Sequence, residues 1–114
     1  MFNLHCTKKL LDRIKPEVQV PRHGTTRLGS WYATALFWKP QMALLVNERT
    51  LLPVLLPLAP AATLAQRFPV ALRDVLRALD TPVEFIDSEI DGMNEVVYAK
   101  TANRSVLGVM NEFA

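Results

Sequence analysis

Residues 30–58, SWYATALFWKPQMALLVNERTLLPVLLPL, decide the fold of this 114-residue chain. The segments SWYATALFW and MALLVN are rich in aromatic and branched apolar residues, which favours strands over helices. LLPVLLPL predicts a third strand. Only the turns KPQ and NERT separate the three strands, and connections this short join antiparallel neighbours. The stretch therefore predicts an antiparallel meander.

The third predicted strand carries two prolines, Pro53 and Pro57, four residues apart. Every second residue of a strand directs its backbone N–H to the same side, so both missing donors fall on one side. A central strand needs those donors for its neighbour. We therefore expect LLPVLLPL to form an edge of the sheet.

The sequence before the meander predicts a strand, a helix and a long loop. FNLHC at residues 2–6 is the strand, and KKLLDRI at residues 8–14 is a short helix with Leu10, Leu11 and Ile14 on one face. Residues 15–29 hold two prolines and two glycines without a helical period. They predict the longest loop and the best candidate for a mobile segment.

The sequence after the meander predicts helices and one more strand. Residues 60–79 indicate a short helix that breaks near Phe68 and a longer helix that begins at Pro69. Thr81 and Glu84 have capping-box spacing for a helix that ends at about Ile90. Residues 95–100 predict the last strand, and a final helix follows with Thr101 or Asn103 as its cap.

Length and composition fit a single domain over residues 1–114, with half of the residues apolar and 21% charged. We expect an α+β fold, with a mainly antiparallel sheet of about five strands and helices packed on one face. The net charge of +2 argues against the broad basic surface of many nucleic-acid-binding proteins.

Composition excludes several other classes of protein. Cys6 is the one cysteine and His5 and His23 are the two histidines, so we expect no disulfide, no metal and no other cofactor. The most apolar stretch, residues 51–65, holds three prolines and is shorter than the roughly 20 residues of a membrane-spanning helix. The first residues lack the pattern of a secretory signal. We therefore expect a cytoplasmic protein without a membrane segment.

The strongest candidate site is the polar segment KTANRS at residues 100–105. A helix that begins there offers backbone N–H groups and the positive end of its dipole, which suit an anion. TKK at residues 7–9 repeats the pattern after the first predicted strand. If the first and last strands are parallel neighbours, both helix starts meet at one end of the sheet. The candidate anion-binding residues are Thr7, Lys8, Lys9, Lys100, Thr101, Asn103, Arg104 and Ser105.

A purely structural role explains the same residues. Thr7, Thr101 and Asn103 are ordinary helix caps, and exposed lysine and arginine side chains need no ligand. Cys6 alternates to the inward face of its strand as a small buried residue, and His5 alternates to the other face as a polar strand residue.

Two further groups favour structural roles over binding. Four acidic residues lack the spacing of a calcium loop and indicate a solvated helix face. The aromatic residues of the meander indicate core or cross-strand pairs rather than a platform on which bases stack. The acidic residues are Glu84, Asp87, Glu89 and Asp91, and the aromatic residues are Trp31, Tyr32, Phe37 and Trp38.

Three classes of function remain open. The first is a binding or regulatory protein with a site for phosphate, a nucleotide or RNA at the two helix starts. The second is a small enzyme that acts on a phosphorylated or carboxylated substrate, with Arg104 and Lys8 or Lys9 as electrostatic stabilisers. No nucleophile–base pair is evident, so no catalytic residue is assigned. The third is a protein–protein interaction module or homodimer that pairs through the proline-marked edge or the aromatic hairpin.

Three segments carry a resemblance to a known family: CTKKLLDRI at 6–14, VNERTLLPVLLP at 46–57 and AKTANRSVLGVMNEF at 99–113. With Trp31 in GSWYATALF, they resemble an uncharacterised bacterial family, a domain of unknown function. Its pattern has CTKKLL near the N-terminus and KTxNRSVLGxMN near the C-terminus. The resemblance runs over nearly the whole chain and implies a small single-domain bacterial protein. It implies no activity, fold or ligand.

Overall fold

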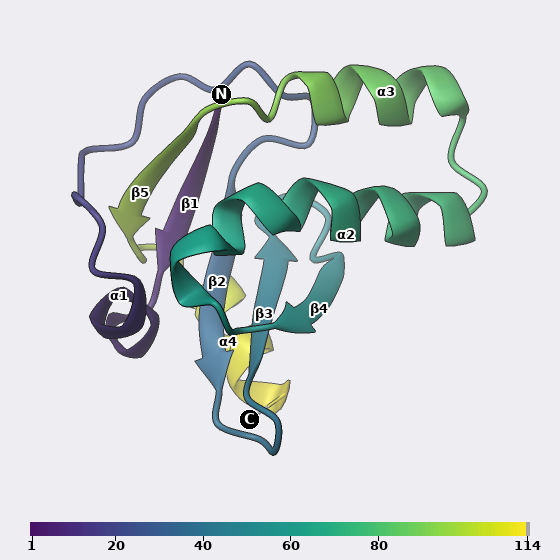
Figure 1. The fold of residues 1–114 in the computed structure, drawn as a ribbon. Coiled ribbons are helices and arrows are strands. Elements are labelled where there is room, and N and C mark those ends of the chain that lie inside the picture. Colours follow the sequence, from purple (N-terminus) through teal and green to yellow (C-terminus); the bar gives the residue numbers. More distant parts are fainter. Residues whose placement is uncertain (114) are drawn as a thin grey trace.

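The computed structural model describes residues 1–113, in which one five-stranded sheet lies between two helical layers (Figure 1). The strands run in the order β4-β3-β2-β1-β5 across the sheet. They are β1 (Phe2–Cys6), β2 (Trp31–Leu36), β3 (Met42–Asn47), β4 (Pro53–Pro57) and β5 (Val96–Lys100). The helices are α1 (Lys8–Ile14), the short 3₁₀ helix η1 (Ala61–Thr63), α2 (Leu64–Ala78), α3 (Val83–Asp91) and α4 (Arg104–Phe113).

The antiparallel meander predicted from residues 30–58 is confirmed. β3 pairs antiparallel with β2 on one side and with β4 on the other. Leu44 and Leu45, successive residues of β3, are both fully buried on opposite faces, which explains the continuous apolar run of this strand. β4 is an edge strand with exposed prolines at both ends, as Pro53 and Pro57 predict.

The expectation of a mainly antiparallel sheet is wrong, because the sheet is mixed. β1 is parallel to both of its neighbours, β2 and β5. Parallel neighbours need a long crossover connection, and the chain between β1 and β2 contains α1 and the loop of residues 15–30. Short turns identify hairpin partners in a sequence, but nothing local shows which strands a long connection brings together.

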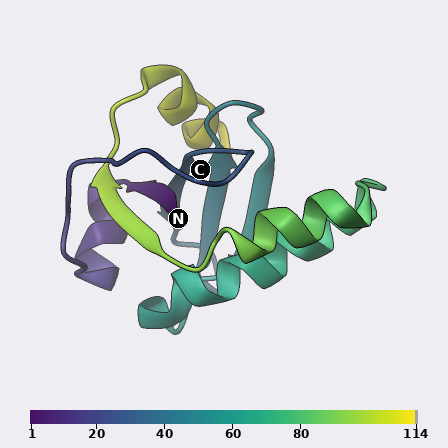
Figure 2. The same ribbon diagram turned by 90° about the horizontal axis from the view of Figure 1, so that it is seen from above.

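The expectation that helices pack on one face is also wrong, since α4 lies on the face opposite α1 and α2 (Figure 2). One face of the sheet packs against Leu10 of α1 and Phe68 of α2. The other face is apolar as well and is covered by Val106 and Met110 of α4. Its buried strand residues are Tyr32, Leu36, Leu44 and Val46. A sheet that is apolar on both faces requires a helix on each of them.

Helix α2 continues through Pro69, so the predicted break near Phe68 is wrong. Proline removes one helical hydrogen bond. The stripe that includes Leu64, Phe68 and Leu72 is buried on both sides of the proline, and its packing outweighs the loss of that hydrogen bond.

The predicted capping box before α3 is also wrong, because Pro82 occupies the N-cap position and no side chain caps this helix.

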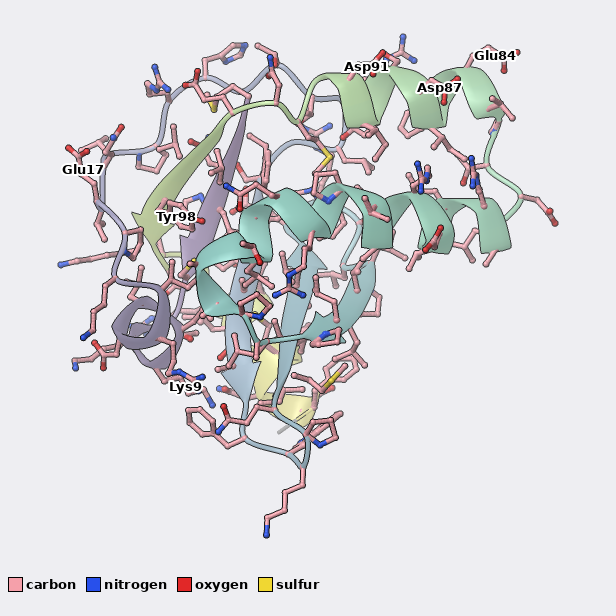
Figure 3. The ribbon with its side chains drawn as sticks, viewed as in Figure 1. Lys9, Glu17, Glu84, Asp87, Asp91 and Tyr98 are labelled. Atoms are coloured by element: carbon pink, nitrogen blue, oxygen red, sulfur yellow. The ribbon has the colours of Figure 1, made fainter. Side chains whose placement is uncertain are left out.

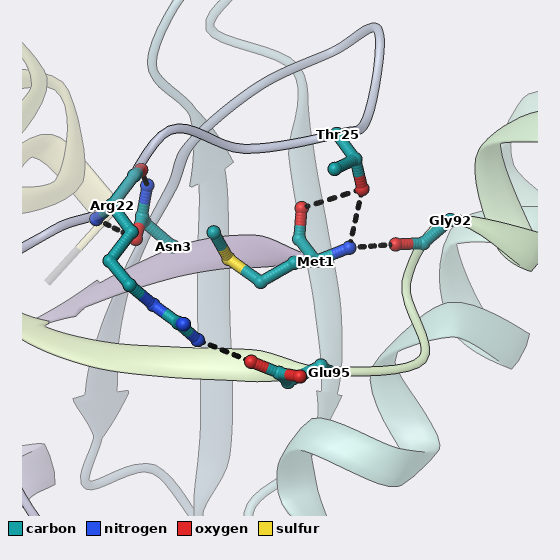
Figure 4. Close-up of polar contacts among 6 residues, drawn as sticks. All are labelled: Met1, Asn3, Arg22, Thr25, Gly92 and Glu95. Atoms are coloured by element: carbon teal, nitrogen blue, oxygen red, sulfur yellow. Dashed lines mark hydrogen bonds and ion pairs between the residues drawn. The ribbon is translucent and has the colours of Figure 1, made fainter.

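The long loop predicted at residues 15–29 is confirmed; it spans residues 15–30 and passes to the α4 side of the sheet (Figure 2). The N–H of Gln19 donates to the carbonyl of Tyr98 at 2.8 Å, beside an isolated parallel bridge between Val18 and Tyr98. Further on, Asn3 and Arg22 exchange two hydrogen bonds, at 2.6 and 3.1 Å (Figure 4). The loop therefore covers the outer edge of β5, and its mobility stays a prediction.

Candidate functional site

The two polar helix starts lie at the same end of the sheet. β1 and β5 are parallel neighbours, and their register pairs Cys6 with Lys100, the last residue of each strand. From there the chain departs to opposite faces, with Leu10 of α1 in one core and Val106 of α4 in the other. In open sheets with parallel strands, such a divergence leaves a cleft beyond the carboxyl ends of the strands.

A cleft of about 360 Å³ occupies this place, and we call it the crevice. Lys8 and Lys100 line it and are exposed, and each ammonium group can donate three hydrogen bonds. Lys8 also pairs with Asp12 at 3.2 Å, but both side chains are largely exposed, so this pair is weak. Two lysines and the hydroxyl of Thr101 can together hold an anion. The crevice residues are Cys6, Lys8, Leu11, Lys100 and Thr101.

The remaining candidate residues make other contacts. The hydroxyl of Thr7 forms a hydrogen bond of 2.9 Å with the hydroxyl of Thr34. Lys9 points away from the crevice, and its ammonium group lies 5.5 Å from the ring centre of Phe37 (Figure 3). Arg104 and Ser105 are exposed on α4 and line neither the crevice nor the other described clefts.

Asn103 is the N-cap of α4, one of the two caps that the sequence suggested. Its Oδ1 accepts hydrogen bonds from the N–H of Ser105 at 3.0 Å and of Val106 at 3.3 Å. Its own N–H donates to the hydroxyl of Tyr32 at 2.9 Å. Because these donors already have acceptors, any anion at this end of the sheet depends mainly on side-chain donors.

Replacing Asn103 with alanine is expected to lower the free energy of unfolding by about 1 kcal/mol, the usual cost of losing an N-cap side chain. Urea denaturation of the variant measures this loss. Ser105→Ala is the matched control, since its side chain makes no cap bond, and it should change stability by less than about 0.5 kcal/mol. Equal losses in the two variants would contradict the assigned cap.

His5 is the residue of this region that sequence reasoning missed. It lies on the face opposite Cys6, is 7% exposed, and stacks on Tyr32 with ring centres 4.5 Å apart. Its Nδ1 lies 2.9 Å from the carbonyl oxygen of Lys100. A carbonyl only accepts hydrogen bonds, so Nδ1 carries the proton and Nε2 is free to accept one in the neutral ring.

The phenol of Tyr32 stays protonated beside His5. Burial raises the pKa of Tyr32, and the carboxylate of Glu48 raises it further, while the hydrogen bond from the Asn103 N–H lowers it. A tyrosine already keeps its proton at neutral pH, so these shifts leave it a neutral hydroxyl. Tyr32 thus joins the cap of α4 to the imidazole of His5.

A second cleft, of about 400 Å³, contains His5 and is called here the His5 cleft. Lys100 and Thr101 line both this cleft and the crevice, so this segment forms a ridge between the two. Apolar side chains of the long loop form the opposite wall. The His5 cleft residues are His5, Val18, Gln19, Val20, Pro21, Lys100, Thr101 and Ala102.

A comparison with family models identifies the chain. The family described as a domain of unknown function, DUF6933, matches residues 3–114. The chain belongs to this family. The resemblance to an uncharacterised domain that the sequence carries is thereby confirmed. Neither the curated proteins nor the solved structures gave a match.

The largest described cleft of this DUF6933 chain lies elsewhere and has a volume of about 440 Å³. Arg22, Arg27 and Arg49 line it, and we call it the arginine cleft. Each guanidinium already has a partner: Arg22 pairs with Glu95, Arg49 donates to the carbonyl of Arg27 at 2.7 Å, and Arg27 lies over the ring of Phe85. Size favours this cleft, but each of its three cations has a partner within the fold, whereas in the crevice Lys8 has only the exposed pair with Asp12.

Cys6 and two of the four aromatic residues of the DUF6933 chain lie where the sequence predicts, and the other two aromatic residues do not. Cys6 is buried, and burial raises the pKa of its thiol to about 12, which confirms the structural role expected for it. Trp31 and Tyr32 are buried as expected, but Phe37 and Trp38 are 56% and 43% exposed. These two aromatic residues lie in the turn after β2, outside the core.

The acidic residues of α3 do not form one solvated face. Glu84, Asp87 and Asp91 are exposed along the helix (Figure 3), but Glu89 is 1% exposed and accepts hydrogen bonds from the long loop. Within residues 1–113, no cluster of acidic, histidine and cysteine side chains is arranged to hold a metal ion. The same residues contain no helix with the length and apolar character needed to span a membrane.

Proposed function

We propose that this protein binds a small ligand with a phosphate or carboxylate group, and that the crevice at the carboxyl ends of β1 and β5 is the binding site. The carrying observation is the convergence of Lys8, Lys100 and Thr101 at the carboxyl ends of two parallel strands from which the chain departs to opposite faces. Ligands of open sheets with parallel strands bind at such positions. The ammonium groups supply charge, and the hydroxyl supplies a directional hydrogen bond.

The size of the crevice favours a small ligand over RNA. A nucleic-acid strand needs a cationic surface that follows several phosphates. Here two lysines line a cleft of about 360 Å³, and the net charge of the chain is only +2. We place the protein in the bacterial cytoplasm as part of this proposal, and the unpaired thiol of Cys6 fits a reducing compartment.

Replacing Lys100 with glutamine tests the site. Isothermal titration calorimetry at low salt should show that inorganic phosphate binds the wild-type protein and binds Lys100→Gln about three- to tenfold more weakly. One charged hydrogen bond accounts for this range, reduced for an exposed side chain. Arg77→Gln is the charge-matched control, because Arg77 is exposed at the far end of α2, and it should leave the affinity unchanged.

Two results would overturn this assignment: no phosphate binding by the wild-type protein, or equal affinities for wild type and Lys100→Gln. Phosphate binding by Arg104→Ala tests whether the site extends to the start of α4. The contacts predict that this variant binds phosphate as the wild type does, because Arg104 lines no described cleft. A loss as large as that of Lys100→Gln would extend the site to the start of α4.

Protein association through the β2–β3 hairpin is a second candidate, supported by the exposed side chains of Phe37 and Trp38. Neighbouring aromatic side chains exposed at a turn are common anchors in protein interfaces. If they join two copies of the chain, sedimentation equilibrium should detect a dimer that Trp38→Ser weakens. A monomer at all concentrations up to about 1 mM, the weak end of specific association, would remove the homodimer from consideration.

A further inference from the structure

We infer that the ligand is a nucleotide whose base occupies the His5 cleft while its phosphate occupies the crevice. This inference rests on the proposed anion site and names the class of molecule that the site takes. It depends on three observations: the state of the His5 ring, the walls around it, and the ridge that the two clefts share.

In its neutral form, the imidazole of His5 offers one fixed hydrogen-bond acceptor. Its Nδ1–H is committed to the carbonyl of Lys100, which leaves the Nε2 lone pair as the polar group available to a ligand. No described residue bonds to Nε2. Among the described residues, the fully buried side-chain N and O atoms without a hydrogen-bond partner are Trp31 Nε1 and Arg73 Nε. His5 Nε2 has no partner and is not one of these atoms, so it retains some exposed surface. His5 itself lines the cleft, which brings its ring within reach of a ligand group that carries an N–H or O–H.

The surroundings of His5 suit a flat ring. Tyr32 stacks on His5 with an angle of 15° between the rings and holds the imidazole in place. The residues that line the cleft come from β1, from the end of β5 and from the loop, and Tyr32 is not among them. Val18, Val20 and Pro21 supply apolar contacts there. An apolar wall beside one oriented acceptor is the combination that holds a nucleobase by its ring and by one N–H group.

The shared ridge connects base and phosphate. Lys100 and Thr101 line both clefts, so a ligand in the His5 cleft meets the same two residues that border the crevice. The clefts measure about 400 and 360 Å³, and each is large enough for one part of a mononucleotide. A sugar over the ridge would join the two parts. An inorganic anion alone would leave the His5 cleft unused.

Calorimetry with matched ligands tests this inference. The probes are ribose 5-phosphate and the four nucleoside 5′-monophosphates. Each monophosphate carries the same sugar and phosphate together with a base. At least one monophosphate should bind about tenfold more tightly than ribose 5-phosphate, the gain typical of one stacked and hydrogen-bonded base. His5→Phe keeps a ring against Tyr32 but removes the acceptor, and it should reduce this gain without changing the affinity for ribose 5-phosphate.

Nuclear magnetic resonance supplies a test that leaves the site itself unchanged. The chain has two histidines, and His23→Gln assigns the signals of His5. The preferred monophosphate should shift the ¹⁵N resonance of His5 Nε2, and ribose 5-phosphate should not.

The outcomes separate the two proposals. If ribose 5-phosphate binds and no monophosphate binds more tightly or shifts His5 Nε2, the nucleotide inference is overturned and the anion site stands. If neither ribose 5-phosphate nor inorganic phosphate binds, the anion site fails. If nucleosides without phosphate bind and shift His5 Nε2 as strongly as the monophosphates do, the His5 cleft binds bases but the crevice does not bind phosphate.

Discussion

Replacing Asn47 with alanine is expected to lower the free energy of unfolding by about 3 kcal/mol. Asn47, the last residue of β3, has no exposed surface. Its Oδ1 accepts hydrogen bonds from the N–H of Arg49 at 3.1 Å and of Thr50 at 2.9 Å. Its Nδ2 donates to the carbonyl of Leu28 at 2.9 Å. Alanine leaves these buried groups without partners, and each such loss costs about 1–3 kcal/mol, partly relieved by water.

Urea denaturation measures this prediction, with Asn111→Ala as the control. Asn111 is exposed on α4, and its replacement should change stability by less than about 0.5 kcal/mol. The bonds of Asn47 join the β3–β4 turn to the end of the long loop, so both segments should also exchange their amide hydrogens faster in the variant. A loss below about 1 kcal/mol would show that Asn47 does not hold them together.

Replacing Glu89 with alanine is expected to cost about 2–3 kcal/mol. Its buried carboxylate accepts hydrogen bonds from two successive backbone groups of the long loop, the N–H of Arg27 at 2.8 Å and the N–H of Leu28 at 3.0 Å. Hydrogen bonds to a charged acceptor are stronger than neutral ones, and alanine leaves both donors unpaired.

The matched control for Glu89 is Asp87→Asn, which changes an exposed carboxylate on the same helix. It should leave stability within about 0.5 kcal/mol of the wild type. Glu89→Gln should fall between Glu89→Ala and the control, because its amide keeps one acceptor but turns an N–H toward the second donor. If Glu89→Ala and Asp87→Asn lose equally little, the carboxylate does not anchor the loop.

The local elements of the fold could be predicted from the sequence, but their arrangement could not. The bounds of β1, α1 and β3 match the expected segments because apolar spacing and breaking residues act within a few positions. The central place of β1 depends on pairing Cys6 with Lys100, residues far apart in the chain. The place of α4 depends on the apolar face around Tyr32 and Leu44, and continuous apolar runs do not reveal which face a helix covers.

Part of the candidate site could also be predicted from the sequence, and part of it could not. Lys8, Lys100 and Thr101 could be found because polar residues directly after a predicted strand form a local signal. His5 could not be found, because its partner carbonyl belongs to Lys100, 95 residues away, and its cleft is closed by a loop without periodicity. The buried position of Glu89 could not be predicted for a similar reason: its carboxylate accepts hydrogen bonds from backbone N–H groups of the long loop, and no side-chain pattern reveals these donors.

The most direct test of the anion site is a map of amide chemical shifts during a titration with inorganic phosphate. The proposed site predicts saturable shifts at Lys8 and neighbouring amides of α1 and at Lys100 and Thr101, which border the crevice. It predicts none at residues 22–30, which border the arginine cleft. Shifts centred on residues 22–30 and Arg49, or no saturable shift at either place, would contradict the proposal that phosphate binds at the carboxyl ends of β1 and β5.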